Sequence, residues 1–132
     1  MQIDHIGYAV KNIEKAKLSF QALGYTFGDT INDTDRNIYI SFGQLDNYKI
    51  ELVAENTQNS EGTTPIKTYI QKIGACPYHI CYKSHEIEKD IEFLKTKRFK
   101  VTIPLTPAVA FGGRRVVFMY SLDVGLIEIL EC

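Results

Sequence analysis

The sequence has no bias in charge, no apolar run long enough to cross a membrane and no secretory leader pattern. Its 15 basic and 16 acidic side chains give a formal net charge of −1, so no global field favours nucleic acid or a membrane surface. No stretch approaches the roughly 18 apolar residues of a membrane helix, and residues 1–5 lack the basic and apolar segments of a leader. We expect a soluble, cytoplasmic protein with a small-molecule partner.

Cysteines are too few, and wrongly spaced, for a disulfide framework or a zinc ribbon. Cys76, Cys81 and Cys132 are an odd number and form no CxxC pair. A hydrophobic content of 45% over 132 residues is enough for a core without such cross-links. We therefore expect one compact domain over residues 1–132.

The first half of the chain has the pattern of a strand, a helix and three further strands. Residues 3–10 alternate as a strand does, and Ile13, Ala16, Phe20 and Leu23 share one helical face. Short β-rich runs follow at residues 25–27, 37–42 and 48–54, separated by clusters of Asp, Asn and Gly. This order, βαβββ, defines a first module over about residues 1–58.

A connector helix and a second βαβββ module are predicted after a polar loop at residues 55–63. Pro65 follows Thr64 at the first position of a helix over about residues 64–74. The second module, over about residues 75–132, has a strand at 78–82, a helix marked by Ile87 and Ile91, and strands at 99–103, 115–120 and 126–130. The fold class is therefore α+β, built from two tandem modules.

The two modules also resemble each other in sequence. With an offset of 74 residues, identities fall at the same places of the strand and helix: His5, Ile6, Tyr8, Ile13, Glu14 and Lys15 match His79, Ile80, Tyr82, Ile87, Glu88 and Lys89. Six identities in eleven positions indicate a fused duplication.

Each module places a glutamate inside the apolar run of its last strand. Glu51 is flanked by Ile50 and Leu52, and Glu128 by Ile127 and Ile129. A carboxylate that faces a sheet interior must be protonated, paired or bound to a cation, because its unpaired charge costs several kcal/mol. Neither run contains a basic residue that would pair the glutamate locally.

Taken alone, each of these residues has an ordinary explanation. A single histidine in a strand is more often structural or solvated than a ligand, and a lone glutamate can face water on an open sheet. The duplication, however, supplies the pair twice, as His5 with Glu51 and His79 with Glu128. Two imidazoles and two carboxylates suit one divalent ion, such as Zn, Co, Ni, Mn or Fe(II).

These residues resemble the vicinal oxygen chelate superfamily, which includes glyoxalase I, methylmalonyl-CoA epimerases, extradiol dioxygenases and drug-resistance proteins. The likeness covers essentially the whole chain and rests on four segments that look like the ligand-bearing strands, at residues 4–10, 49–52, 78–82 and 125–130. It implies that the two modules curl a mixed sheet around a metal cleft, that His5, Glu51, His79 and Glu128 are the ligands, and that the protein is a homodimer.

Within the superfamily the chain is most similar to the methylmalonyl-CoA epimerases. The opening at residues 4–10, the connector helix and the Gly112–Phe118 stretch all look like segments of them. Tyr78, however, stands where these epimerases usually have a second histidine. Their acid followed by Gln-Gly-Val is here represented by Asp35, the candidate for the second acid/base, which a turn would equally explain.

The resemblance implies proton removal from a carbon next to a carbonyl, in a substrate linked to CoA or glutathione. Glu128 would be both a metal ligand and the base. Lactoylglutathione lyase (glyoxalase I) is the alternative activity, and a non-catalytic drug-binding resistance protein is a lesser one. Arg114 and Arg115 either bind an anionic group of the substrate or are solvated beside a turn.

Overall fold

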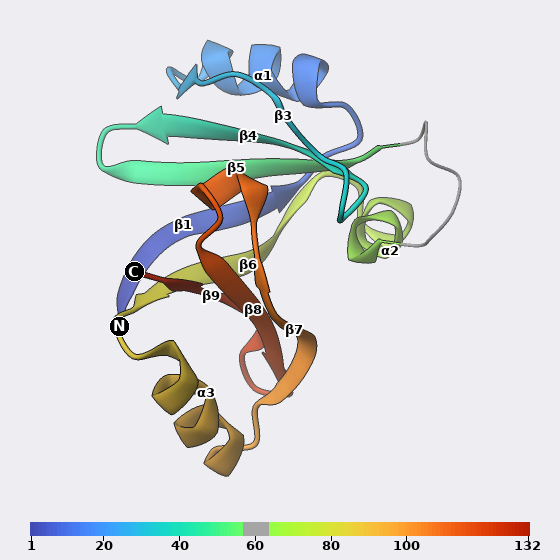
Figure 1. The fold of residues 1–132 in the computed structure, drawn as a ribbon. Helices are drawn as coiled ribbons and strands as arrows, with labels where there is room; N and C mark the ends of the chain where they lie inside the picture. Colours follow the sequence, from blue (N-terminus) through green and yellow to red (C-terminus); the bar gives the residue numbers. More distant parts are fainter. Residues whose placement is uncertain (57–63) are drawn as a thin grey trace. The chain divides into compact units, whose positions relative to one another are not determined.

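The computed structural model describes residues 1–56 and 64–132. Within these residues the chain forms nine strands, three α-helices and one short 3-10 helix, an α+β composition (Figure 1). Most of the polar loop expected at residues 55–63 lies outside the described residues. The chain divides into two compact units: the first-repeat unit, Ile6–Tyr78, and the second-repeat unit, which combines Met1–His5 with His79–Cys132.

The first-repeat unit is organised around strand β5 (Tyr48–Glu55). This strand pairs in parallel with β1 (Gln2–Ala9) and antiparallel with β4 (Ile38–Leu45). Two short strands, β2 (Thr26–Phe27) and β3 (Ile31–Asp33), pair with β4. Helix α1 (Ile13–Ala22) covers the apolar cluster on this sheet, and α2 (Pro65–Lys72) packs beside β5.

The second-repeat unit has the same plan around strand β9 (Gly125–Glu131). It pairs in parallel with β6 (Cys76–Ser84) and antiparallel with β8 (Arg115–Ser121), which in turn pairs with β7 (Lys100–Pro107). Helix α3 (Ile87–Thr96) packs its buried Ile87 and Ile91 onto this sheet. The 3-10 turn η1 (Val109–Phe111) joins β7 to β8.

The predicted elements are therefore present, and the repeat extends to their boundaries. Strands β1 and β6, helices α1 and α3, and strands β2 and β7 each begin 74 residues apart. The first repeat has one strand more than predicted, because Asp33 accepts a hydrogen bond from the backbone N–H of Arg36 and closes a turn that pairs β3 with β4.

Local sequence signals explain where the helices begin and end. The Asn12 side chain caps α1 by accepting the N–H of Lys15, and Pro65 occupies the first turn of α2. Gly24 and Gly74, which follow α1 and α2, have positive φ angles of 110° and 93°. Among the described residues, none of the helices is long and apolar enough to span a membrane.

Candidate metal centre

Three of the predicted ligands meet inside the second-repeat unit. His5 of β1, His79 of β6 and Glu128 of β9 are 1%, 3% and 2% exposed. The Nε2 atoms of the two histidines lie 3.4 Å apart. Glu128 Oε2 lies 3.0 Å from His79 Nε2 and 3.9 Å from His5 Nε2. Two ring nitrogens and one carboxylate oxygen thus converge on one buried point.

Strand register explains why Glu128 and His79 point to the same place. Cys81, two residues beyond His79 in β6, is aligned with Glu128 in the parallel pair of β6 and β9. Side chains two residues apart in a strand share a face, and aligned residues of neighbouring strands do too. On the other side of β9, Phe118 is aligned with Glu128. The apolar run around Glu128 therefore turns its carboxylate toward the histidine face.

Asp4 determines which nitrogen of His5 faces the cluster. Its Oδ2 lies 2.8 Å from His5 Nδ1, and its side chain is 13% exposed. An ionised carboxylate only accepts hydrogen bonds, so Nδ1 carries the proton and Nε2 presents its lone pair to His79 and Glu128. A carboxylate behind a histidine is the usual way in which proteins orient an imidazole ligand.

Two phenylalanines form apolar walls beside the imidazoles. The Phe111 ring stacks on His5 with a centroid distance of 5.8 Å and an interplanar angle of 20°. Phe118 meets His79 edge to face at 5.3 Å. Such walls exclude water and strengthen electrostatic interactions among the polar groups that they enclose.

Asp4, Phe111 and Phe118 were not singled out from the sequence as site residues. The only sequence signal for Asp4 is that it directly precedes His5. Phe118 belongs to a predicted strand, but nothing in its pattern indicates a partner in β6. Phe111 lies in the loop before that strand, where no periodicity points to His5.

The fourth predicted ligand, Glu51, lies in β5 of the first-repeat unit and is 4% exposed. Its register repeats that of Glu128. Glu51 is aligned with Gly7, two residues beyond His5 in β1, and with Phe42 in β4. Glu51 is thus related to strand β1 as Glu128 is to β6.

Asp35 occupies an exposed position in the turn between β3 and β4. The neighbouring Asp33, which is 1% exposed, forms the turn contacts instead, since it binds both the backbone N–H and the guanidinium of Arg36. The role of Asp35 as an acid/base stays a prediction.

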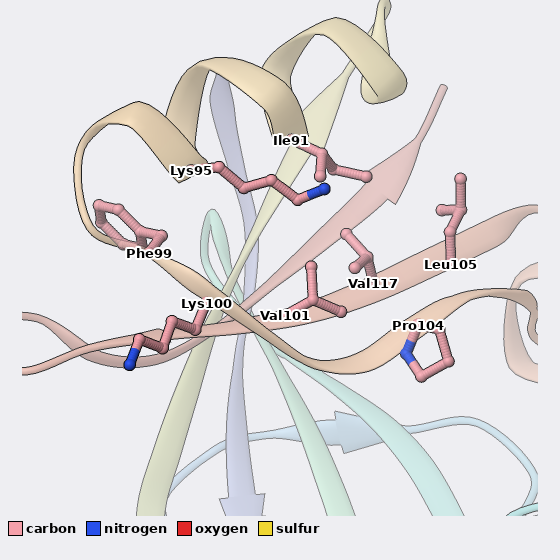
Figure 2. A pocket seen from close by; sticks show the side chains of 8 residues that line it. All are labelled: Ile91, Lys95, Phe99, Lys100, Val101, Pro104, Leu105 and Val117. Carbon is pink, nitrogen blue, oxygen red and sulfur yellow. The ribbon is translucent and has the colours of Figure 1, made fainter.

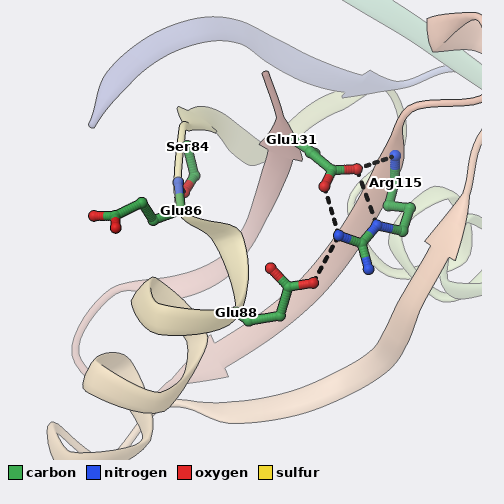
Figure 3. Close-up of polar contacts among 5 residues, drawn as sticks. All are labelled: Ser84, Glu86, Glu88, Arg115 and Glu131. Carbon is green, nitrogen blue, oxygen red and sulfur yellow. Dashed lines mark hydrogen bonds and ion pairs between the residues drawn. The ribbon is translucent and has the colours of Figure 1, made fainter.

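The two arginines after the glycine turn make contacts within the second-repeat unit. Arg115 donates to Glu131 at 2.9 Å through Nε and to Glu88 at 2.7 Å through Nη2 (Figure 3). These hydrogen bonds lower the pKa of both carboxyls. Arg114 Nε donates to the carbonyl of Phe111. Arg115 thus binds carboxylates of its own chain.

The donor set of the cluster fits a divalent ion. Ligand atoms held about 2.1 Å from one ion in a tetrahedral arrangement lie about 3.4 Å apart. The three separations in the cluster, 3.0, 3.4 and 3.9 Å, bracket this value. Imidazole nitrogen and carboxylate oxygen are ligands that Zn, Co, Ni and Mn accept. The cluster could therefore bind one such ion, without specifying which.

Comparisons with known proteins place this geometry in a family. A model described as the glyoxalase/bleomycin resistance protein/dioxygenase superfamily matches residues 4–118. The ethylmalonyl-CoA/methylmalonyl-CoA epimerase of Cereibacter sphaeroides is 27% identical over 124 residues, which is 92% of this chain and 90% of that protein.

Solved structures share the fold over nearly the whole chain. A hypothetical protein from Bacillus halodurans superposes with a TM-score of 0.82 at 26% identity and covers 99% of this chain and 94% of its own. A variant of Streptomyces coelicolor methylmalonyl-CoA epimerase, in complex with 2-nitronate-propionyl-CoA, has a TM-score of 0.81 at 17% identity and covers 99% and 96%. The predicted fold class and resemblance are confirmed: the chain belongs to the glyoxalase/bleomycin resistance protein/dioxygenase superfamily.

Proposed function

We propose that this protein is a metal-dependent enzyme that removes and returns the proton next to the carbonyl of a CoA thioester. Epimerisation of a methylmalonyl-CoA type of substrate is the activity supported best. The observation that carries the proposal is the buried cluster of His5, His79 and Glu128, whose donor atoms converge within hydrogen-bonding range of one another. The similarity to the Cereibacter epimerase supports the choice of substrate.

The proposed ligands of one divalent ion are His5, Glu51, His79 and Glu128. The register of β5 with β1 supports including Glu51, because the equivalent register of β9 with β6 accompanies the close approach of Glu128 to His79. The ion, when bound, supplies positive charge to a substrate oxygen as a Lewis acid. Zn, Co, Ni and Mn all suit this donor set.

Glu128 is the proposed base. Its carboxylate is 2% exposed and lies beside the two imidazoles and opposite Phe118. In such a dry site little water competes for the substrate proton, and a positioned carboxylate typically contributes a factor of about 10²–10⁴ to the rate. Asp4 keeps His5 Nε2 unprotonated, so this ring does not compete as a proton donor.

Asp35 is the proposed second acid, which returns the proton from the other side of the substrate carbon. An epimerase needs such a group to invert the configuration. Loss of Asp35 should therefore stop inversion and leave exchange of the substrate proton by Glu128. This distinction makes the role of Asp35 testable apart from that of the base.

The experiment is to incubate the protein with one epimer of methylmalonyl-CoA in D₂O, with and without added divalent metal. NMR follows loss of the proton next to the thioester carbonyl, and chiral analysis follows inversion. The proposal expects both in the metal-loaded wild type, neither in Glu128→Gln, and exchange without inversion in Asp35→Asn. Wild-type protein that binds metal but exchanges no substrate proton would contradict it.

Lactoylglutathione lyase is the second candidate, because the same base and donor set can move a proton between neighbouring carbons. The hemithioacetal of methylglyoxal with glutathione is therefore the second substrate to assay. Activity with this substrate alone would replace CoA by glutathione as the carrier. If the protein bound compounds without changing either substrate, a drug-binding module would be the better account. A homodimeric state and a cytoplasmic location remain predictions.

A further inference from the structure

An apolar hollow lies between α3 and the strands β7 and β8 of the second-repeat unit (Figure 2). Its volume is about 530 Å³, within the range of about 300–1,000 Å³ that is usual for small-molecule sites. The α3 hollow, as we name it, is lined chiefly by Ile91, Phe99, Val101, Leu105 and Val117, with Lys95 at its rim. In Figure 2, Val101, Leu105 and Val117 point from the strands toward the helix, and Ile91 points down from it.

The α3 hollow and the metal cluster lie on opposite faces of β8. Val117 lines the hollow, whereas the next residue, Phe118, contacts His79. Successive side chains of a strand point to opposite faces of the sheet. A ligand in the α3 hollow would therefore bind apart from the candidate metal centre, and an inference about this hollow does not rest on the proposed function.

The equivalent place in the first repeat is filled with aromatic rings. Behind α1, Phe20 packs edge to face on both Tyr8 and Tyr25, and Phe27 stacks on Tyr25. With the offset of 74 residues, the second repeat replaces Phe20 by Leu94 and Phe27 by Val101. The second repeat thus lacks two rings at the place where the α3 hollow opens.

Basic side chains gather beside the α3 hollow in a chain whose formal net charge is −1. Lys95, Lys97, Arg98 and Lys100 fall within six consecutive positions, and all four are exposed. A cation in the last turn of α3 also stabilises the helix end, which accounts for Lys95 but not for Arg98 and Lys100 beyond it. In Figure 2 the Lys95 side chain runs along the hollow beneath α3, while Lys100 points away from it.

The lining indicates an elongated occupant. Val101 and Leu105 both belong to β7 and are four residues apart, which corresponds to about 13 Å of extended strand. An alkyl chain lying along β7 would cover Val101, Val117 and Leu105, and its acidic end would meet Lys95. We propose that the α3 hollow binds a free, unbranched, medium-chain carboxylate.

The test is isothermal titration calorimetry of the full-length protein with decanoate, below the concentration at which decanoate forms micelles. We expect one saturable site per chain with a Kd below about 1 mM. Hexanoate should bind more weakly, by about fourfold for each methylene removed. Decanol, which lacks the charge, should bind less tightly than decanoate.

Two variants with matched controls locate the site. Val101→Phe restores the ring that Phe27 supplies in the first repeat and should abolish binding, whereas Val124→Phe makes the same change at an exposed turn residue and should not. Lys95→Gln should weaken binding about three- to fivefold, as expected for an exposed ion pair. Lys97→Gln removes an equal charge from a side chain that lies over Phe93, and should change binding less.

Several results would overturn the proposal. These are the absence of saturable decanoate binding, unchanged binding in Val101→Phe, and binding to vesicles of anionic lipid but not to monomeric decanoate. Self-association of the wild type that Val101→Phe abolishes would assign the hollow to a second copy of the chain instead. The thermal unfolding of Val101→Phe should match or exceed that of the wild type, which excludes misfolding as the cause of lost binding.

Discussion

In β5, Glu51 is aligned with Gly7 on one side and Phe42 on the other; in β9, Glu128 is aligned with Cys81 and Phe118. The two repeats therefore keep the same relation between a glutamate, a phenylalanine and the strand that carries the histidine. Their surroundings differ. The first repeat packs rings behind α1, whereas the second leaves the α3 hollow and adds the Arg115 ion pairs.

This difference separates two kinds of constraint on a duplicated module. A ligand must keep its position to within a fraction of an ångström, because donor atoms have to meet a common point. Apolar filling behind a helix has only to occupy the available volume, so Phe27 and Val101 can stand at equivalent positions. The two repeats have diverged where packing is permissive and agree at the predicted ligands.

The most severe test of this comparison makes the two glutamates unequal. Glu128→Gln should lower kcat for proton exchange by about 10²–10⁴ because it removes the proposed base. Glu51→Gln should mainly weaken metal retention, since it removes a proposed ligand only. Steady-state kinetics at saturating metal distinguish the two effects. Full activity of Glu128→Gln would refute the assignment of the base.

The next test concerns the residue that precedes each histidine. Asp4 orients His5 through a hydrogen bond of 2.8 Å, whereas the equivalent residue before His79 is Tyr78. Asp4→Asn should weaken metal affinity about 10- to 100-fold, as is typical for loss of a carboxylate behind a histidine ligand. Competition with a chelator measures this affinity. Tyr78→Phe is the control, and an equal loss there would show that the effect is not specific to Asp4.

A third test addresses the rings behind α1. A Cβ added to Gly43 would overlap the Phe27 ring, whereas one added to Gly28 meets nothing within 4 Å. Gly43→Ala should lower the free energy of unfolding by about 1–3 kcal/mol through overpacking, and Gly28→Ala should not. Denaturant unfolding provides the values. If the added Phe27→Leu change did not recover part of the loss in Gly43→Ala, the overlap would not be its cause.

The smallest expected effect concerns the ion pairs that are particular to the second repeat. Hydrogen bonds from Arg115 lower the pKa of Glu131 and Glu88 below their ordinary value of 4.5. A carboxyl with a lowered folded pKa stabilises the protein above its unfolded pKa, and this contribution is lost as the pH falls through the folded value. The Tm gap between wild type and Arg115→Gln should thus be constant from about pH 7 to pH 5.5 and close at lower pH.

Arg114→Gln is the matched control for this pH dependence. Arg114 Nε donates to the carbonyl of Phe111, which does not titrate. Its Tm gap to the wild type should therefore change little between about pH 7 and pH 3. A gap for Arg115→Gln that widened toward acid would contradict the sign of the effect.

The fold was predictable because its signals are local and repeated. Alternation in the strands, the cap at Asn12 and Pro65 in the connector helix each fix an element without reference to distant residues. The duplication then doubled each signal. The extra strand β3 was missed because it depends on the Asp33 turn pairing two short segments that have no clear alternation.

For the candidate site, the sequence identified residues that are costly to bury but not their surroundings. Glu128 stands out because it interrupts an apolar run, and His79 because it repeats His5. The stacking of Phe111 on His5 and the engagement of Arg115 by Glu131 and Glu88 depend on segments brought together by folding. The α3 hollow likewise depends on how α3 packs on β7, which no local pattern specifies.

The most direct test of the central claim is the metal content of protein purified without chelator, measured by elemental analysis. Wild type and a His5→Ala, His79→Ala double variant are compared before and after reconstitution with divalent ions, with circular dichroism as a check that the variant is folded. The predicted result is about one divalent ion per chain in the wild type and its loss in the variant. A folded wild type that retains no specific metal after reconstitution would contradict the claim.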